Sequence, residues 1–263
     1  MRMRVISMAV PGLLLAFSPG ASQRVETGFL DRVVTLAGYE YRYQVYVPRT
    51  YSGSTRWPVI LFLHGAGERG SDGLLQTAVG LAPAIREAPA RFPAIVVLPQ
   101  SPGDSLWVGA PAEAAMAALQ RTMDEFSTDP ARVYLTGLSM GGNGTWYLAY
   151  HYPERFAAVV PICGWVSSGA IRLERALSVV PAEDGEPFEA LGRRLKNVPI
   201  WIFHGEMDGA VPVEESRKAA QALRSSGGLV RYTELLGVDH NSWDAAYGST
   251  ELVTWLFAQR RGS

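Results

Sequence analysis

Short apolar runs recur along the chain, and amphipathic stretches lie between many of them. Most of these runs have four to six residues, the length of a strand buried on both faces of a sheet. Amphipathic periodicity at three- and four-residue spacing predicts the helices. The expected strands are 29–34, 39–47, 59–63, 94–98, 133–136, 157–162, 200–203 and 230–235, and the expected helices are 111–126, 140–152, 213–223 and 250–259.

Buried strands that alternate with amphipathic helices predict an α/β fold with a mostly parallel central sheet and helices on both faces. Within 39–47 the residues Tyr41, Tyr43, Val45 and Val47 alternate, so they should share one face of their strand. Asp129-Pro130 predicts a turn before the strand at 133–136. The least regular stretch, 165–197, suggests a small surface insertion near the site and no large lid domain.

The N-terminus differs from the rest of the chain. Arg2 and Arg4 precede an apolar stretch at 5–17, which Pro11 interrupts and small residues follow. A basic start, a short apolar middle and a small-residue end are typical of a secretory signal peptide. We therefore expect a signal peptide at 1–22, a single catalytic domain at 23–263, export to the periplasm or beyond, and no stable membrane anchor after cleavage.

Composition narrows the possible functions. The 263 residues are 48% hydrophobic and 19% charged, as in ordinary globular proteins, and the formal net charge of −1 argues against nucleic acid as a partner. A single cysteine, Cys163, rules out an internal disulfide and a paired-cysteine zinc site, so no metal is expected. Cys163 ends an apolar run and is interpreted as a small core residue, because no helix start or base adjoins it as a nucleophile would require.

Gly137-Leu138-Ser139-Met140-Gly141 carries the strongest chemical signal. The Gly-x-Ser-x-Gly pattern is weak alone, but here it follows a predicted buried strand directly and opens a predicted helix. A sharp strand-to-helix turn exposes a serine hydroxyl above a sheet, and flanking glycines let neighbouring backbone approach. Ser139 is therefore the candidate nucleophile.

A serine hydroxyl needs a base, and four histidines are available. His64 and His204 each end a strand before a glycine, where a backbone role is expected, and His151 ends the helix after Ser139. His240 follows the final predicted strand, where the base stands in the chain order serine, acid, histidine. It is the candidate base.

The acid should lie between Ser139 and His240 in the sequence. Asp208 follows the strand at 200–203 and is the first choice, while Glu206 in the same loop remains an alternative. Asp239 adjoins the histidine and Asp184 lies in the irregular stretch, so both are less well placed. An oxyanion would need two backbone donors, expected from Met140 and from Ala66 or Gly67 after the strand at 59–63, with Ala66 preferred.

Three segments resemble bacterial esterases of the dienelactone-hydrolase and feruloyl-esterase-like group, which overlaps with polyhydroxybutyrate-depolymerase-like and prolyl-oligopeptidase-like hydrolases. They are 63–70 (LHGAGERG), 137–142 (GLSMGG) and 239–244 (DHNSWD). The resemblance spans about 39–261. It implies an α/β-hydrolase fold, carboxylic-ester hydrolysis without a cofactor, a triad of Ser139, Asp208 and His240, and an oxyanion contribution from Ala66.

One departure from that group follows Cys163-Gly164, where Trp165 and Val166 replace the glycine-rich sequence expected of relatives. An indole there would reshape an acyl pocket. Trp107 and Trp243 are further candidate walls of a substrate site, although ordinary burial explains each tryptophan equally well.

Taken together, these residues predict a serine carboxylesterase acting on short-chain or aromatic esters, either small molecules or groups linked to a polysaccharide. A serine peptidase of the prolyl-oligopeptidase-like type would use the same triad, but usually carries an extra domain for which this chain has no room. A catalytically silent exported binding protein would need a broken triad, and no expected position is replaced. The oligomeric state cannot be predicted from these patterns.

Overall fold

A computed structural model describes residues 25–167 and 179–262. The predicted signal peptide at 1–22 lies outside the described residues. In the described part of the chain, eight strands form one sheet in the order β1-β2-β4-β3-β5-β6-β7-β8. The strands are β1 (Gly28–Leu36), β2 (Tyr39–Val47), β3 (Trp57–Leu63), β4 (Ile95–Pro99), β5 (Thr128–Leu138), β6 (Ala158–Ile162), β7 (Ile200–Gly205) and β8 (Val230–Leu235).

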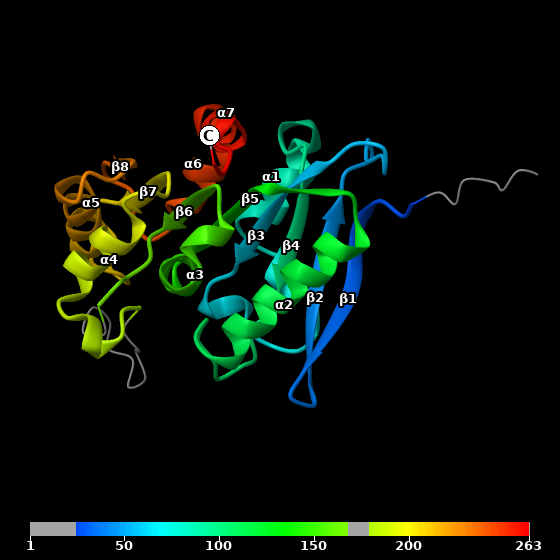
Figure 1. The fold of residues 1–263 in the computed structure, drawn as a ribbon, viewed down its shortest axis with the longest axis horizontal. Helices are drawn as coiled ribbons and strands as arrows, with labels where there is room; N and C mark the ends of the chain where they lie inside the picture. The colour runs from blue at the N-terminus through cyan, green and yellow to red at the C-terminus, as the bar shows by residue number, and fades with distance from the viewer. Residues whose placement is uncertain (1–24, 168–178, 263) are drawn as a thin grey trace, which may run out of the picture.

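The sheet is mostly parallel, as the sequence predicts. Only the β1–β2 hairpin and the β2–β4 pair run antiparallel, and the remaining neighbours are parallel. Figure 1 shows the hairpin at one end of the sheet and β7 and β8 at the other. Because parallel strands share one direction, the loops after β3, β5, β7 and β8 emerge along the same edge.

Helices cover both faces of this sheet (Figure 1). One face packs against α2, α3, α4 and α5, and the other against α1, α6 and α7. Short 3₁₀ turns lie in the connections between strands and α-helices, at Ala66–Glu68, Leu75–Thr77, Pro89–Arg91, Pro153–Arg155 and Ala182–Asp184. The α-helices are α1 (Leu81–Glu87), α2 (Ala110–Glu125), α3 (Met140–His151), α4 (Pro187–Leu195), α5 (Glu214–Ser225), α6 (Trp243–Gly248) and α7 (Thr250–Ala258).

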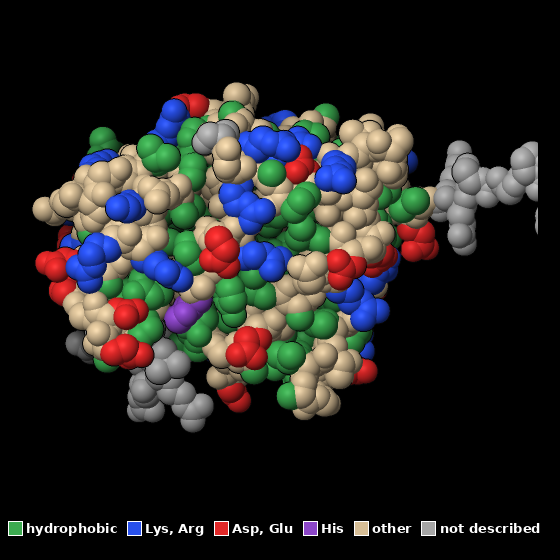
Figure 2. All heavy atoms as spheres, viewed as in Figure 1, with side chains coloured by type: hydrophobic (Ala, Val, Ile, Leu, Met, Phe, Trp, Pro, Cys, Tyr) green, Lys and Arg blue, Asp and Glu red, His purple; other side chains and the backbone are tan. Residues whose placement is uncertain are grey.

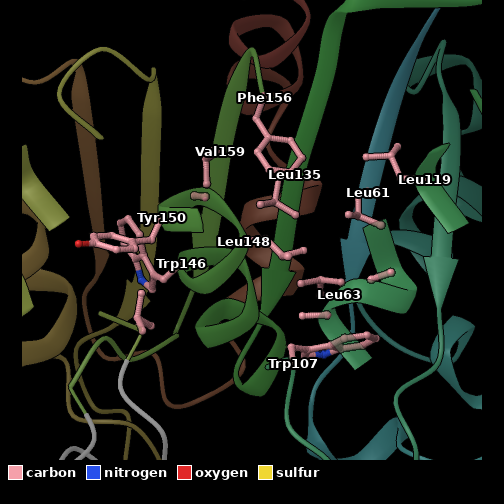
Figure 3. Close-up of a cluster of buried hydrophobic side chains, with 14 of the residues drawn as sticks. Leu61, Leu63, Trp107, Leu119, Leu135, Trp146, Leu148, Tyr150, Phe156 and Val159 are labelled. Carbon is pink, nitrogen blue, oxygen red and sulfur yellow. The ribbon is translucent and has the colours of Figure 1, made fainter. Parts of the chain in front are cut away.

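The larger core cluster lies between the sheet and α2 to α5. Figure 3 shows Leu61 and Leu135 on neighbouring strands facing Leu119 of α2 and Leu148 of α3. Burying each such leucine stabilises the fold by about 1.5–3 kcal/mol. The predicted alternation in β2 is confirmed, since Tyr43, Val45 and Val47 join this cluster and Tyr41 packs against it.

Two local predictions were wrong. The turn predicted at Asp129-Pro130 is the start of β5, where the register against β3 shifts between Trp57 and Val59. Such an irregularity accommodates a proline that cannot donate to the ladder. The stretch predicted as a surface insertion contains α4, whose Ala190, Leu191 and Leu195 enter the core.

Within the described residues, the segment joining β6 to β7 holds one 3₁₀ turn and α4 and forms no lid domain. None of the helices described is long and apolar enough to cross a membrane. Figure 2 shows acidic and basic side chains interspersed over the face in view, without a patch of one sign.

Candidate active site

Ser139 occupies the sharp turn between β5 and α3. Its backbone has φ of 54° and ψ of −117°, and its N–H donates to the carbonyl of Ile162 at 2.9 Å. A non-glycine residue in this region costs of order 1–3 kcal/mol and persists only where its surroundings enforce it. The surroundings of Ser139 enforce this conformation, because the backbone packs tightly on both sides of it. A β-carbon built on Gly137 or Gly141 would lie 2.4 Å or less from the nearest backbone atom. Ser139 is half-buried, so its hydroxyl can be reached at the edge of the sheet.

His240 lies in the loop between β8 and α6 and faces Ser139. Its Nε2 is 2.9 Å from Ser139 Oγ. The imidazole is 27% exposed, and the ring of Trp243 meets it edge-on with centroids 5.4 Å apart. All four histidines lie in the described part of the chain, and His240 is the one whose ring is hydrogen-bonded to Ser139 there.

Asp208 lies in the loop between β7 and α5, with Oδ2 2.7 Å from His240 Nδ1. The carboxylate fixes the proton on Nδ1, so that Nε2 is free to accept the Ser139 hydroxyl. The other oxygen, Oδ1, accepts the backbone N–H groups of Ala210 and Val211 at 2.8 and 2.9 Å. Burial alone would raise the pKa of Asp208, but the hydrogen bonds it accepts hold that pKa well below its ordinary value.

The alternative acids point elsewhere. Glu206 Oε2 accepts the backbone N–H of Gly237 at 3.0 Å, and Asp239 Oδ1 accepts that of Asn241 at 3.1 Å. Asp184 Oδ2 accepts the Tyr150 hydroxyl at 2.5 Å, on the far end of α3. The geometry therefore joins Asp208, and none of these three acids, to His240.

Two backbone N–H groups beside Ser139 are free of helical partners. Met140 is the first residue of α3, and Ala66 the first residue of its 3₁₀ turn, so neither N–H bonds within its own helix. Gly65 packs close to the serine, since a β-carbon built there would lie 3.7 Å from Ser139 Cβ. The turn that carries Ala66 is thereby held next to the nucleophile.

His64 fixes the direction of the peptide before Ala66. Its Nδ1 donates to Gly65 O at 2.6 Å, and its Nε2 accepts Ser101 N–H at 2.9 Å. In a planar trans peptide the carbonyl and the following N–H point in opposite directions, so the Ala66 N–H points away from the His64 ring. Burial lowers the pKa of His64 to about 4, which keeps the ring neutral and its tautomer fixed.

The three predicted substrate-binding tryptophans differ in position. Trp107 is 1% exposed and donates its indole N–H to His64 O at 3.0 Å, and Figure 3 shows its ring beside Leu63 in the core. Trp165 is 2% exposed in the same cluster. Neither offers a ring face to a ligand in this structure, which corrects the expectation for both. Trp243 is half-buried next to His240 and remains a candidate.

Cys163 is fully buried, as expected of a core residue, and burial raises the pKa of its thiol to about 12. Its sulfur lies within 4.8 Å of the ligand atoms of Asp208 and His240. A metal would need a thiolate and the pair of side chains that are already hydrogen-bonded to each other. We assign no metal to this cluster.

Sequence reasoning missed two buried polar residues beside the site. His204 was assigned a backbone role, yet its Nε2 lies 3.1 Å from Asp208 Oδ2. Glu215 in α5 accepts the backbone N–H groups of Val166 and Ser167 at 2.7 and 2.9 Å and so holds the segment after β6. For His204, its place four residues before the candidate acid was a sequence signal of a contact with that acid. Glu215 gave no such signal, because acidic residues are common in the first turn of a helix.

A family model described as the prolyl oligopeptidase family matches residues 102–258, more than half of the chain. The chain belongs to this family. The prolyl oligopeptidase match includes Ser139, Asp208 and His240, whereas the turn with Ala66 precedes it.

The chain is also similar to solved and curated proteins. A crystal structure of a thermostable esterase is 34% identical, with a TM-score of 0.76, over 89% of this chain and 63% of that one. An uncharacterized secreted protein of Arthroderma benhamiae is 28% identical over 71% of this chain and 22% of its own length. Poly(3-hydroxyalkanoate) depolymerase C of Paucimonas lemoignei is 29% identical over 49% of this chain and 34% of its own length.

The chain thus spans about a fifth and a third of the two curated relatives, and less than two thirds of the esterase chain. The expected α/β-hydrolase fold is confirmed by the esterase structure and by the mostly parallel sheet. The predicted resemblance to esterases of this fold is also confirmed, by the similarity to the thermostable esterase and by the family match.

Proposed function

We propose that the protein is a serine carboxylesterase that hydrolyses short-chain or aromatic carboxylic esters through an acyl-enzyme on Ser139. One observation carries the proposal: hydrogen bonds run without a break from Ser139 Oγ to His240 and on to Asp208, at 2.9 and 2.7 Å. This order of nucleophile, base and orienting acid activates a hydroxyl that is otherwise a weak nucleophile.

In the first half of the reaction, Ser139 Oγ attacks the ester carbonyl while His240 Nε2 takes the hydroxyl proton. The resulting imidazolium is stabilised by Asp208 and returns the proton to the leaving alcohol. Water then attacks the acyl-enzyme, with His240 as base again, and releases the acid. No cofactor takes part in this scheme.

The developing oxyanion needs donors already in place. We assign this role to the backbone N–H groups of Met140 and Ala66, one at the start of each helical turn that adjoins Ser139. In acyl-transfer sites of this kind, each donor is typically responsible for about 10²–10³ in kcat.

We favour esters over amides as the substrates because a solved relative that is 34% identical to this chain is named an esterase. The same triad can cleave amides, and the family's name keeps a peptidase as the competing outcome. Trp243 beside His240 offers an aromatic surface for a small acyl or aromatic group, whether the ester is a free small molecule or linked to a polysaccharide. Because residues 25–167 and 179–262 form no lid domain, we expect each methylene added to the acyl chain to gain far less than the ~0.8 kcal/mol of full burial.

The test is a panel of p-nitrophenyl esters of increasing chain length, with methyl ferulate and a chromogenic dipeptide amide. We expect kcat/KM to be highest from acetyl to butyryl, or on the aromatic ester. Ser139→Ala should lower turnover about a million-fold, whereas Ser225→Ala, at the exposed end of α5, should leave it unchanged. A maximum at ten or more carbons, or an amide cleaved as fast as the best ester, would overturn the substrate assignment.

Export is proposed from the basic and apolar residues at 1–22, and the relative named a secreted protein supports it. Expression of the whole chain in a bacterial host, followed by fractionation and N-terminal sequencing, tests this. A mature protein beginning near residue 21 or 23 outside the cytoplasm is expected. Uncleaved enzyme confined to the cytoplasm would contradict it.

A further inference from the structure

A second imidazole contacts the carboxylate oxygen that orients His240. His204 Nε2 lies 3.1 Å from Asp208 Oδ2, the same oxygen that His240 Nδ1 approaches at 2.7 Å. His204 belongs to β7 and, like the Asp208 carboxylate, is inaccessible to solvent. Together with the two backbone donors to Oδ1, the carboxylate accepts four hydrogen bonds.

Both nitrogens of His204 are held, and this fixes the ring. Nε2 also lies 3.1 Å from Val211 O, so it faces two acceptors and must carry a proton. Nδ1 is 2.7 Å from the hydroxyl of Ser216 in the first turn of α5. Whether Nδ1 accepts or donates that hydrogen bond, Nε2 donates toward Asp208. The donor is therefore anchored to both β7 and α5.

We propose that His204 is a positioning residue that holds the carboxylate of Asp208 with Oδ2 directed at His240. Without this donor the buried carboxylate would be held by fewer hydrogen bonds, and Oδ2 would be less well fixed opposite His240. The inference deepens the proposed function, on whose triad it rests.

The same contact also moderates the acid. A carboxylate oxygen that accepts a second N–H is less basic, so it stabilises a protonated His240 less strongly. Removing the N–H of His204 should therefore make Asp208 a stronger partner of the imidazolium. The consequence is that the acid limb of the activity profile should move to higher pH.

Few other ionisable groups face this pair. Beside His240 lies the buried thiol of Cys163, which stays protonated. Beside His204 in the β7–β8 register lies Glu234, but its carboxylate is bound by Arg217 and by the Tyr232 hydroxyl. Glu206 and Asp239, in the two loops that carry the acid and the base, accept backbone N–H groups of Gly237 and Asn241. Asp208 is therefore the acid through which His204 acts.

The experiment compares His204→Phe, which keeps a planar ring but no donor, with His204→Gln, whose amide can replace the Nε2–H. The matched control is His151→Phe at the end of α3. For each variant, kcat, KM and the pH profile of kcat/KM on p-nitrophenyl acetate are measured per folded molecule. Folding is checked by circular dichroism and thermal unfolding.

For His204→Phe we expect kcat to fall between roughly ten- and a hundredfold at little change in KM. The acid limb should move to higher pH. His204→Gln should restore most of the lost kcat and return the acid limb most of the way to its wild-type position. His151→Phe should change neither. A folded His204→Phe with the wild-type profile, or a shift of the same size in His151→Phe, would overturn the proposal.

A readout that needs no substrate separates this inference from the proposed function. NMR titration of labelled histidines follows the ring of His240 directly in the wild type and in His204→Phe. We expect its midpoint to rise in the variant even if every ester in the panel proves a poor substrate. An unmoved midpoint refutes the role of His204, whereas absent ester hydrolysis with a moved midpoint refutes only the esterase assignment. If His204→Phe does not fold, Ser216→Ala, which frees one side of the ring, should show a smaller shift in the same direction, and its absence counts against the proposal.

Discussion

The α-carbon of Gly141 packs against the carbonyl oxygen of Leu63 so closely that a β-carbon built there would lie 1.9 Å from that oxygen. Gly141 is two residues after the proposed nucleophile, and Leu63 ends the neighbouring strand β3. The close approach lets α3 start directly above the sheet. Any side chain at this position would push the first turn of α3, and Ser139 with it, away from β3.

Gly141→Ala should therefore damage both stability and activity. The contact is with backbone, which cannot move aside as a flexible side chain could, so we expect a loss of about 3 kcal/mol in the free energy of unfolding. Urea unfolding measures it. Gly53→Ala, at a glycine with nothing within 4 Å of the added carbon, is the control and should change stability by less than about 0.5 kcal/mol. Equal effects at the two positions would contradict the packing argument.

Asp208→Asn should lower kcat by roughly four orders of magnitude, because an amide no longer selects the tautomer of His240 that accepts the serine proton. Glu206→Gln is the matched change in the same loop and should cost little, since that side chain bonds Gly237. Initial rates on p-nitrophenyl acetate distinguish them. The reverse order of effects would make Glu206 the acid.

Thiol-blocking reagents should leave activity nearly unchanged. Cys163 is inaccessible, and burial raises the pKa of its thiol to about 12, so almost no thiolate is available to react. A fluorophosphonate should instead inactivate the enzyme and label Ser139, as peptide mass spectrometry would show. Inactivation that follows thiol modification one to one, without a serine label, would refute this assignment.

His64 should make stability depend on pH between about 7 and 4. Burial lowers the pKa of His64 to about 4 in the folded protein, while the unfolded chain takes up that proton near pH 6.5. In this window the unfolded state binds more protons, so the free energy of unfolding falls as pH falls, by roughly 2 kcal/mol from pH 7 to pH 5.

Replacing His64 with glutamine keeps a donor and an acceptor but removes the titration. His64→Gln should therefore lose most of this pH-dependent term, as measured by urea unfolding at pH 7 and pH 5. His151→Gln, at a half-buried histidine, should retain it. Identical pH dependence in the wild type and His64→Gln would show that His64 titrates normally.

Much of the fold could be predicted because its signals are local. The apolar runs of β3 and β4 and the alternation in β2 follow from burial on two faces or one. Helix α4 was missed because its apolar stripe spans only nine residues behind a proline and is flanked by loop residues. The extended start of β5 was missed because Pro130 suggests a turn unless the irregular register at this end of β5 is known.

The candidate site could be predicted in part for the same reason. Ser139 and His240 stand out by motif and chain order, and Asp208 by its place after β7. The contact of His204 with Asp208 was not predictable, since it depends on how the loop after β7 folds back over the end of its own strand. The burial of Trp107 and Trp165 likewise depends on close packing at glycines such as Gly144, whose added β-carbon would lie 2.3 Å from Trp107 Cβ.

The strand that precedes the His240 loop, β8, is also one of the two edges of the sheet. β8 pairs only with β7, and none of its residues is buried. Edge strands with little burial open locally at lower free energy than the central strands do. On mild heating the enzyme should lose activity reversibly, by detachment of β8 and its loop, at temperatures where the central strands still resist hydrogen exchange. Thermal inactivation would then report the attachment of one peripheral strand and not the melting of the whole domain.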